Sequence, residues 1–140
     1  MKKVNILLVE DNEGDILLIR EALEERKIAN NLTAITNGAD ALSYIFKQGS
    51  YKNAETPDLI ILDINLPKKN GHEVLHTIKE DENVKKIPVI MLTTSSSEID
   101  VMKSYKHHAN CFITKPVDVN DFIEAVTKIE QFWLSIVTLP

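Results

Sequence analysis

The sequence predicts a single α/β domain in which five strands of a doubly wound parallel sheet alternate with five helices. Three observations predict this class. At 140 residues and 15.8 kDa, the chain is long enough for one hydrophobic core. Apolar residues make up 44% and charged residues 26% of the chain, as in ordinary globular proteins. Short apolar runs alternate with amphipathic stretches, which is typical of parallel strands joined by right-handed helical crossovers.

The strands are predicted from runs of consecutive apolar residues, many of them β-branched. Such runs fit strands that are covered by helices on both faces. The weaker second and fifth runs are expected nearer the edges of the sheet. In chain order, the five predicted strands cover residues 6–9, 31–36, 59–62, 89–92 and 111–113.

Between the strands, apolar residues recur every three or four positions, which is the spacing of one helix face. Hydroxyl side chains at residues 95–97 precede the fourth of these stripes and suit the start of a helix. The five stripes are Ile16, Ile19 and Leu23; Leu42, Ile45 and Phe46; Val74, Leu75 and Ile78; Ile99, Met102 and Tyr105; and Phe122, Val126, Ile129 and Trp133.

Charge and composition exclude several classes of protein. The 16 basic and 21 acidic residues give a net charge of −5 with no basic stripe, so we expect no direct binding to nucleic acid. No apolar run is long enough for a bilayer, so no membrane association is expected. A single cysteine, Cys111, cannot form a disulfide within the chain, and the first residues lack the pattern of a signal peptide. These features predict a cytoplasmic location.

Side chains that carry chemistry follow the ends of four predicted strands. Glu10 and Asp11 follow the first strand, Asp63 the third, Thr93 the fourth and Lys115 the fifth. The carboxyl ends of parallel strands meet at one edge of a sheet, where ligands bind. Three carboxylates there would repel one another and recruit a hard cation, for which Mg²⁺ is the best candidate. Each residue alone could be structural, but the convergence of five predicts a functional site.

The chain resembles the CheY-like receiver domain of two-component response regulators from residue 4 to about residue 129. Asp63 precedes Thr93 by 30 residues and Lys115 by 52, and both separations are typical of that family. The resemblance implies a flavodoxin-like (βα)5 fold with strand order 2-1-3-4-5 and a receiver domain over residues 1–131. The motifs that carry it are Val9-Glu10-Asp11; Leu62-Asp63-Ile64-Asn65-Leu66-Pro67 with Gly71 after it; Thr93-Thr94-Ser95; and Thr114-Lys115-Pro116.

The resemblance implies a phosphoacceptor signalling domain rather than an enzyme with a separate substrate. Asp63 would accept a phosphoryl group from a sensor histidine kinase or a phosphotransfer protein. Asp11 and Asp63 would ligate Mg²⁺ directly, and Glu10 would do so through water. The main-chain carbonyl of Asn65 would complete the protein ligands. Lys115 would neutralise the charge on the phosphoryl group.

The resemblance also implies a conformational switch that signals to a downstream protein partner through the surface formed by the fourth helix, the fifth strand and the fifth helix. Thr93 would donate its hydroxyl to the phosphoryl group and draw the following loop inward. Phe112 occupies the position of the switch aromatic, although ordinary packing remains the alternative for this side chain. The bond between Lys115 and Pro116 is expected to be cis. Thr94 stands where smaller residues are frequent, which would alter the access of water to the site.

Residues 132–140 extend past the usual end of a receiver domain. Ile136, Val137 and Leu139 have strand-like character and suit either of two arrangements: folding back over the core, or forming a dimerisation arm in a homodimer. The ending resembles that of small single-domain regulators that partner bacterial phytochromes, so a phytochrome-like kinase is one candidate donor, and the signal that the kinase senses, light or another, stays open. Because no output domain follows residue 140, we expect a stand-alone regulator that signals through its partner.

Two rival functions come from other classes. His72-Glu73-Val74-Leu75-His76 matches the H-E-x-x-H motif of zinc metallopeptidases, with Glu73 as the general base. Helical geometry turns both histidines toward solvent, and no third ligand is evident beyond Glu98 or Asp100. A phosphohydrolase with an aspartate nucleophile usually carries a general acid two positions later, where this chain has Asn65. We therefore expect a phosphorylated Asp63 that decays slowly.

Overall fold

The computed structural model describes residues 3–28, 30–94 and 111–137, with only the backbone for residues 94, 112 and 130–137. Five parallel strands form one sheet in the order β2-β1-β3-β4-β5, which confirms the predicted fold class and strand order. The strands are β1 (Val4–Val9), β2 (Asn30–Ile35), β3 (Leu59–Asp63), β4 (Val89–Thr94) and β5 (Cys111–Lys115).

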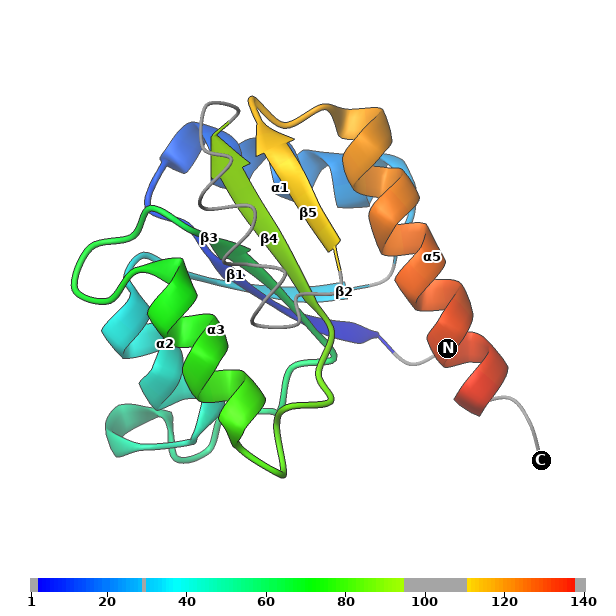
Figure 1. Ribbon diagram of the computed structural model, residues 1–140. Coiled ribbons are helices and arrows are strands. Elements are labelled where there is room, and N and C mark those ends of the chain that lie inside the picture. The colour runs from blue at the N-terminus through cyan, green and yellow to red at the C-terminus, as the bar shows by residue number, and fades with distance from the viewer. Residues whose placement is uncertain (1–2, 29, 95–110, 138–140) are drawn as a thin grey trace.

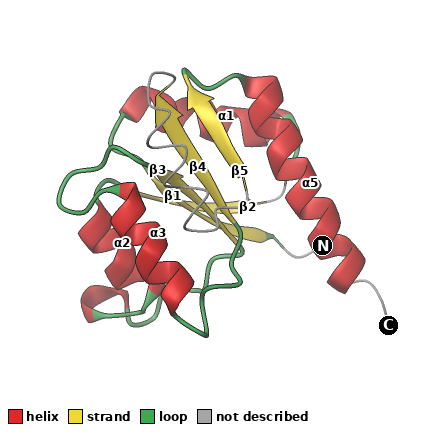
Figure 2. Ribbon diagram, viewed as in Figure 1, coloured by secondary structure: helices red, strands yellow, loops and turns green. Residues whose placement is uncertain are grey.

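Helices cover both faces of the sheet (Figure 1; Figure 2). The predicted fourth helix, with its stripe Ile99, Met102 and Tyr105, and its cap at residues 95–97 lie outside the described residues. The described helices are α1 (Glu13–Glu25), α2 (Gly38–Ile45), α3 (Gly71–Glu80) and α5 (Val119–Val137), with a short 3-10 helix, η1 (Gly49–Tyr51).

The apolar strand runs divide their side chains between two hydrophobic clusters because successive residues of a strand point to opposite faces. Leu7, Ile60 and Met91 pack with α2 and α3 on one face. Leu8, Ile61 and Ile90 pack with α1 and α5 on the other. Both faces are therefore buried, which is why the strands read as continuous apolar runs.

Asparagine side chains fix where three of the helices begin. Asn12, Asn37 and Asn70 each accept a hydrogen bond from the backbone N–H three residues later, at 2.9, 2.8 and 3.0 Å. Each bond satisfies a donor that the first helical turn leaves without a partner. Asn12 and Asn70 cap α1 and α3 from the loops that follow β1 and β3, so both helices begin beside the carboxyl edge of the sheet.

The strand-like interpretation of residues 136 and 137 is wrong. Helix α5 runs without a break from Val119 to Val137 and so continues past residue 131. Its apolar stripe keeps the spacing of three or four residues into this segment, and that periodicity outweighs the weak strand preference of β-branched residues. In Figure 1 the last turns of α5 extend past the sheet. Residues 138–140 lie outside the described part.

Within the described residues, no helix is both long and apolar enough to cross a membrane.

Candidate functional site

Three carboxylates meet at the carboxyl edge of the sheet. Glu10 directly follows β1, Asp11 follows it, and Asp63 is the last residue of β3. One carboxylate oxygen from each lies within 4.8 Å of the others. Glu10 and Asp63 are buried, whereas Asp11 is exposed to solvent. This is the only such group of three or more acidic, histidine or cysteine side chains among the described residues.

Backbone N–H groups hold two of these carboxylates in place. Oε2 of Glu10 accepts hydrogen bonds from the N–H groups of Asp11 and Asn12, at 3.1 and 3.2 Å. Oδ1 of Asp63 accepts one from the N–H of Asn65, at 3.2 Å. The bonds come from the loops that follow β1 and β3, so these loops orient the oxygens that remain available.

The ammonium group of Lys115, the last residue of β5, lies among the acids. Its Nζ donates to Oδ2 of Asp63 at 3.0 Å and lies 3.3 Å from Oδ2 of Asp15. It also lies 2.5 Å from Oε1 of Glu10. Burial alone would lower the pKa of Lys115, but the contacts with Glu10 and Asp63 outweigh it and raise that pKa. Lys115 is therefore charged at neutral pH.

Glu10 is the most perturbed acid at the site. Burial raises its pKa to about 7, with a further contribution from the neighbouring Asp63 that the contact with Lys115 opposes. Oε1 of Glu10 is buried, and the ammonium group of Lys115 is the cation that contacts it among the described residues. A buried acceptor of this kind suits a cation, so the donor set fits a hard divalent metal ion.

Two glycines allow close packing against the end of β3 and the loop that follows it. A Cβ on Gly71 would lie 2.3 Å from the carbonyl oxygen of Asp63, and one on Gly38 would lie 2.0 Å from the carbonyl oxygen of Lys69. The N–H of Gly71 donates to the carbonyl oxygen of Ile64 at 2.8 Å. Helix α3 thus begins directly against the end of β3. Gly71 belongs to the quoted motifs, whereas nothing in the sequence singles out Gly38.

The expected switch residues are only partly described. Thr93 is buried, with 1% of its surface exposed, near the end of β4, where it pairs in register with Thr114 of β5. The backbone of Phe112 lies in β5, but its side chain is outside the described part, so its switch role stays a prediction. The peptide bond between Lys115 and Pro116 is cis.

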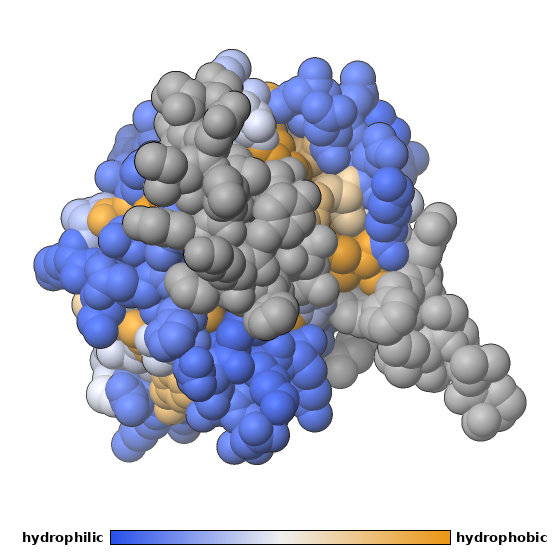
Figure 3. Space-filling model, viewed as in Figure 1, coloured by the Kyte–Doolittle hydropathy of each residue, from blue (hydrophilic) through white to orange (hydrophobic). Residues whose placement is uncertain are grey.

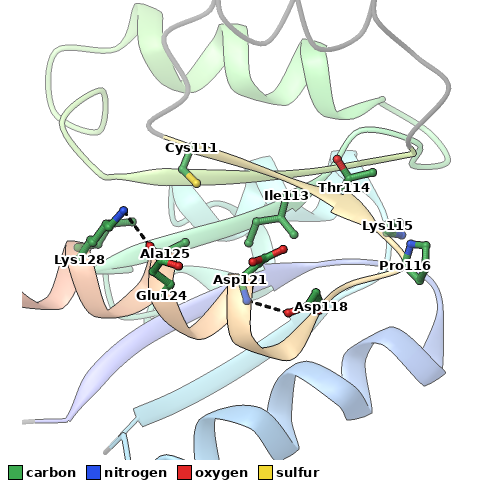
Figure 4. A pocket seen from close by; sticks show the side chains of 11 residues that line it. Cys111, Ile113, Thr114, Lys115, Pro116, Asp118, Asp121, Glu124, Ala125 and Lys128 are labelled. Atoms are coloured by element: carbon green, nitrogen blue, oxygen red, sulfur yellow. Dashed lines mark hydrogen bonds and ion pairs between the residues drawn. The ribbon is translucent and has the colours of Figure 1, made fainter.

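A large open hollow lies beside the acidic site rather than at it. It has a volume of about 740 Å³ and runs between β5 and α5, with Cys111 toward one end and Lys115 toward the other (Figure 4). Ile113, Ala125 and other apolar residues line part of it, and apolar surface is visible over these elements (Figure 3). This hollow lies on the surface where the resemblance places partner contacts.

The H-E-x-x-H motif does not form a metal centre within the described part of the chain. His72 and His76 lie on α3, where His72 is partly buried and the side chain of His76 is 56% exposed, 3.6 Å from Glu80. Neither histidine belongs to a group of three metal-binding side chains there. The proposed third ligands, Glu98 and Asp100, lie outside the described residues.

An acidic cluster beside a partly buried lysine, at the carboxyl edge of a parallel sheet ordered 2-1-3-4-5, is the arrangement that the resemblance to receiver domains predicts. The response regulator receiver domain family matches residues 6–127, and the chain belongs to this family. It is therefore a signalling domain of the two-component type. The zinc metallopeptidase alternative finds no support in this assignment.

Phytochrome response regulators are among the similar proteins. The chain is 47% identical to the response regulator Rcp1 of Synechocystis sp. over 135 residues, which are 96% of this chain and 92% of that protein. It matches the crystal structure of the phosphorylated cyanobacterial phytochrome response regulator RcpA with a TM-score of 0.83 and 47% identity, covering 99% of both chains. The Mn²⁺-bound form of Rcp1 matches with a TM-score of 0.81 and 46% identity over 98% of this chain and 99% of that one.

One residue at the site was missed by sequence reasoning. Asp15, on the first turn of α1, reaches Lys115 although it belongs to none of the receiver motifs quoted above. An acidic residue in a first helical turn is ordinarily explained by the helix dipole, so its type and position gave no separate signal. Its place four residues after Asp11 is the one hint that it faces the same edge.

Proposed function

We propose that the chain is a response regulator that accepts a phosphoryl group on Asp63 and passes the signal to a protein partner. The observation that carries the proposal is the position of Asp63. Asp63 is 2% exposed, and its carboxylate lies within the group of three acids and accepts a hydrogen bond from Lys115. A nucleophilic carboxylate beside a fixed ammonium group suits phosphoryl transfer, which depends on positioning and on neutralising charge.

The residues around Asp63 divide the chemistry among them. Oδ2 of Asp63 would attack the phosphorus of a phosphohistidine, and the phosphoryl group would pass to that oxygen while its bond to the histidine nitrogen breaks. Lys115 would neutralise charge on the transferred group. Thr93, at the end of the neighbouring strand, would donate its hydroxyl to the same group.

Glu10, Asp11, Asp63 and the main-chain carbonyl of Asn65 would hold Mg²⁺. The bound ion would supply positive charge that offsets the charges of the acids and of the phosphoryl oxygens. Two features support this assignment: the carboxylate oxygens lie close together, and Oε1 of Glu10 is buried with a positive charge, that of Lys115, in contact with it. The Mn²⁺-bound form of the similar regulator Rcp1 supports it as well.

The proposed phosphoryl donor is a phytochrome-like sensor histidine kinase, or a phosphotransfer protein linked to one. The similarity to RcpA and Rcp1 supports this class of donor. Phosphorylation would shift an existing equilibrium at the surface formed by the predicted fourth helix, β5 and α5, of which the described part, between β5 and α5, is partly apolar and hollowed. That surface would contact a downstream protein or a second copy of the chain.

Intact mass after incubation with acetyl phosphate tests the proposal. The wild type should gain one phosphoryl group with Mg²⁺ and none without it. Asp63→Asn should gain none, while Asp121→Asn, which removes an exposed carboxylate from α5, should behave as the wild type. A full adduct on Asp63→Asn would contradict the assignment of the phosphoacceptor.

A further inference from the structure

Asp15 contacts the site but has no role in the chemistry described so far. It lies on the first turn of α1, and its side chain is 26% exposed. Its backbone N–H is held at 2.9 Å by the side chain of Asn12, so the position from which its carboxylate reaches Lys115 is fixed. The distance between Oδ2 of Asp15 and Nζ of Lys115 is 3.3 Å, which is short enough for an ion pair.

Asp15 differs from the other two acids that contact Lys115. Glu10 and Asp63 belong to the group of carboxylates that could hold a cation, and Asp15 does not. A divalent ion at that group would offset the charges of Glu10 and Asp63 and weaken their attraction for the ammonium group. The attraction between Asp15 and Lys115 would remain. Asp15 would then be the main protein anion that still holds Lys115.

We propose that Asp15 is a positioning residue that competes with the phosphoryl group for the ammonium of Lys115. The inference rests on the proposed function, because it takes Asp63 as the phosphoacceptor. Lys115 is a compact charge on a flexible stem, so an ammonium that turns toward a phosphoryl oxygen gives up part of its contact with Asp15. The negative charge of Asp15 also repels the phosphoryl group. Both effects make the phosphorylated state less stable.

The expected size of the effect follows from the exposure of Asp15. An ion pair that is open to solvent on one side is weak, since water screens the attraction. Losing the charge should therefore change binding by roughly two- to fivefold, rather than by orders of magnitude. Two opposite changes are expected. The binding of a phosphoryl mimic should tighten, and the binding of Mg²⁺ alone should weaken, because a freed Lys115 would stay closer to Glu10 and Asp63.

Calorimetric titration of the full chain tests these two changes. For Asp15→Asn, we expect beryllofluoride to bind about two- to fivefold more tightly at saturating Mg²⁺, and Mg²⁺ alone to bind about two- to fivefold more weakly. Glu13→Gln removes the same charge from the same helical turn and should match the wild type, because Glu13 is exposed. General damage to the site would weaken the binding of both beryllofluoride and Mg²⁺. Unchanged or weaker beryllofluoride binding by Asp15→Asn, or an equal gain in Glu13→Gln, would overturn the proposal.

A double-mutant cycle tests whether the effect passes through Lys115. In a Lys115→Ala background, Asp15→Asn should weaken Mg²⁺ binding by less than half as much, on a logarithmic scale, as in the wild type. An undiminished effect would overturn the proposal. Failure of the proposed function can be distinguished from failure of this inference. A wild type that binds no beryllofluoride with Mg²⁺ would remove both the phosphoacceptor function of Asp63 and the role of Asp15. Normal binding by the wild type with no change in Asp15→Asn would remove the role of Asp15 alone.

Discussion

The Nζ of Lys115 lies 3.0 Å from Oδ2 of Asp63, although 52 residues separate the two along the chain. The sheet brings them together, because β3 and β5 flank β4 and all three strands end at the same edge. Among the described residues, this ammonium is the cation that contacts the buried carboxylates of Glu10 and Asp63. Lys115 and a divalent metal ion would therefore oppose each other at the same acids.

Lys115→Ala should strengthen Mg²⁺ binding while it slows phosphorylation. Removing the ammonium removes its repulsion of the metal ion, and we expect the affinity for Mg²⁺ to rise by about tenfold. The phosphoryl group would lose its neutralising partner, so the rate of labelling by acetyl phosphate should fall.

Lys128→Ala is the matched control for that variant, because Lys128 is 72% exposed on α5 and its ion pair, among the residues that the structure describes, is with the exposed Glu124. Calorimetry for Mg²⁺ and intact mass for labelling give the two readouts. Wild-type labelling by Lys115→Ala would remove Lys115 from the proposed chemistry.

The stability of the metal-free protein should fall as the pH rises from about 4.5 to about 7. Burial raises the pKa of Glu10 from 4.5 to about 7, so within this range the folded state keeps a proton that the unfolded chain has released. Stability falls with pH wherever the folded state binds more protons. The contribution of Glu10 should be about 1–3 kcal/mol across this range.

Melting temperatures in the presence of a chelator, compared between the wild type and Glu10→Gln, isolate this contribution. The glutamine variant cannot titrate at this position, so the difference between the two proteins should change with pH. Parallel profiles would show that Glu10 titrates in the folded protein as it does in the unfolded chain.

Gly71→Ala should destabilise the fold by about 1–3 kcal/mol. The added Cβ would lie 2.3 Å from the carbonyl oxygen of Asp63 and 2.7 Å from the Cα of Ile64. Both are backbone atoms at the end of a buried strand, so they cannot move aside without shifting the site.

Gly14→Ala provides the contrast, since the nearest atom to its Cβ would be a side-chain oxygen of Asn12 at 3.1 Å, and alanine favours helix. Urea unfolding should separate the two variants, with Gly14→Ala close to the wild type. A free energy of unfolding for Gly71→Ala equal to that of the wild type would mean that α3 can move away from β3 at little cost.

Ending the chain after residue 131 should convert a dimer into a monomer in solution if residues 132–140 form a dimerisation arm. The arm stays a prediction, now for a segment that continues α5 as a helix at least to Val137. Light scattering on the full and shortened chains gives the comparison. An unchanged number of chains per particle would favour the arrangement in which the segment folds against its own core.

The sheet and most of the acidic site can be predicted from the sequence because both depend on the same pattern of apolar runs. Apolar runs mark where strands end, and the residues directly after those ends meet at one edge. Glu10, Asp11, Asp63 and Lys115 were found in this way, and the structure brings all four together.

The contact of Asp15 could not be predicted, because it depends on how the first turn of α1 sits against the end of β5. Hydrophobic periodicity fixes which face of a helix is buried but not which side chain of its first turn reaches a neighbouring strand. The helical state of residues 136 and 137 was missed for a related reason. The β-branched residues there favour a strand when they are considered singly, but the repeating apolar stripe of α5 decides the structure.

Locating the phosphoryl group is the most direct test of the central claim that Asp63 is the phosphoacceptor. Borohydride reduces an aspartyl phosphate to the alcohol of homoserine and releases the phosphate, so peptide mapping after reduction identifies the residue that carried it. The wild type, treated with acetyl phosphate and Mg²⁺, should show this conversion at position 63 alone. Conversion at Glu10 or Asp11, or at an acid away from the site, with position 63 unchanged, would contradict the assignment.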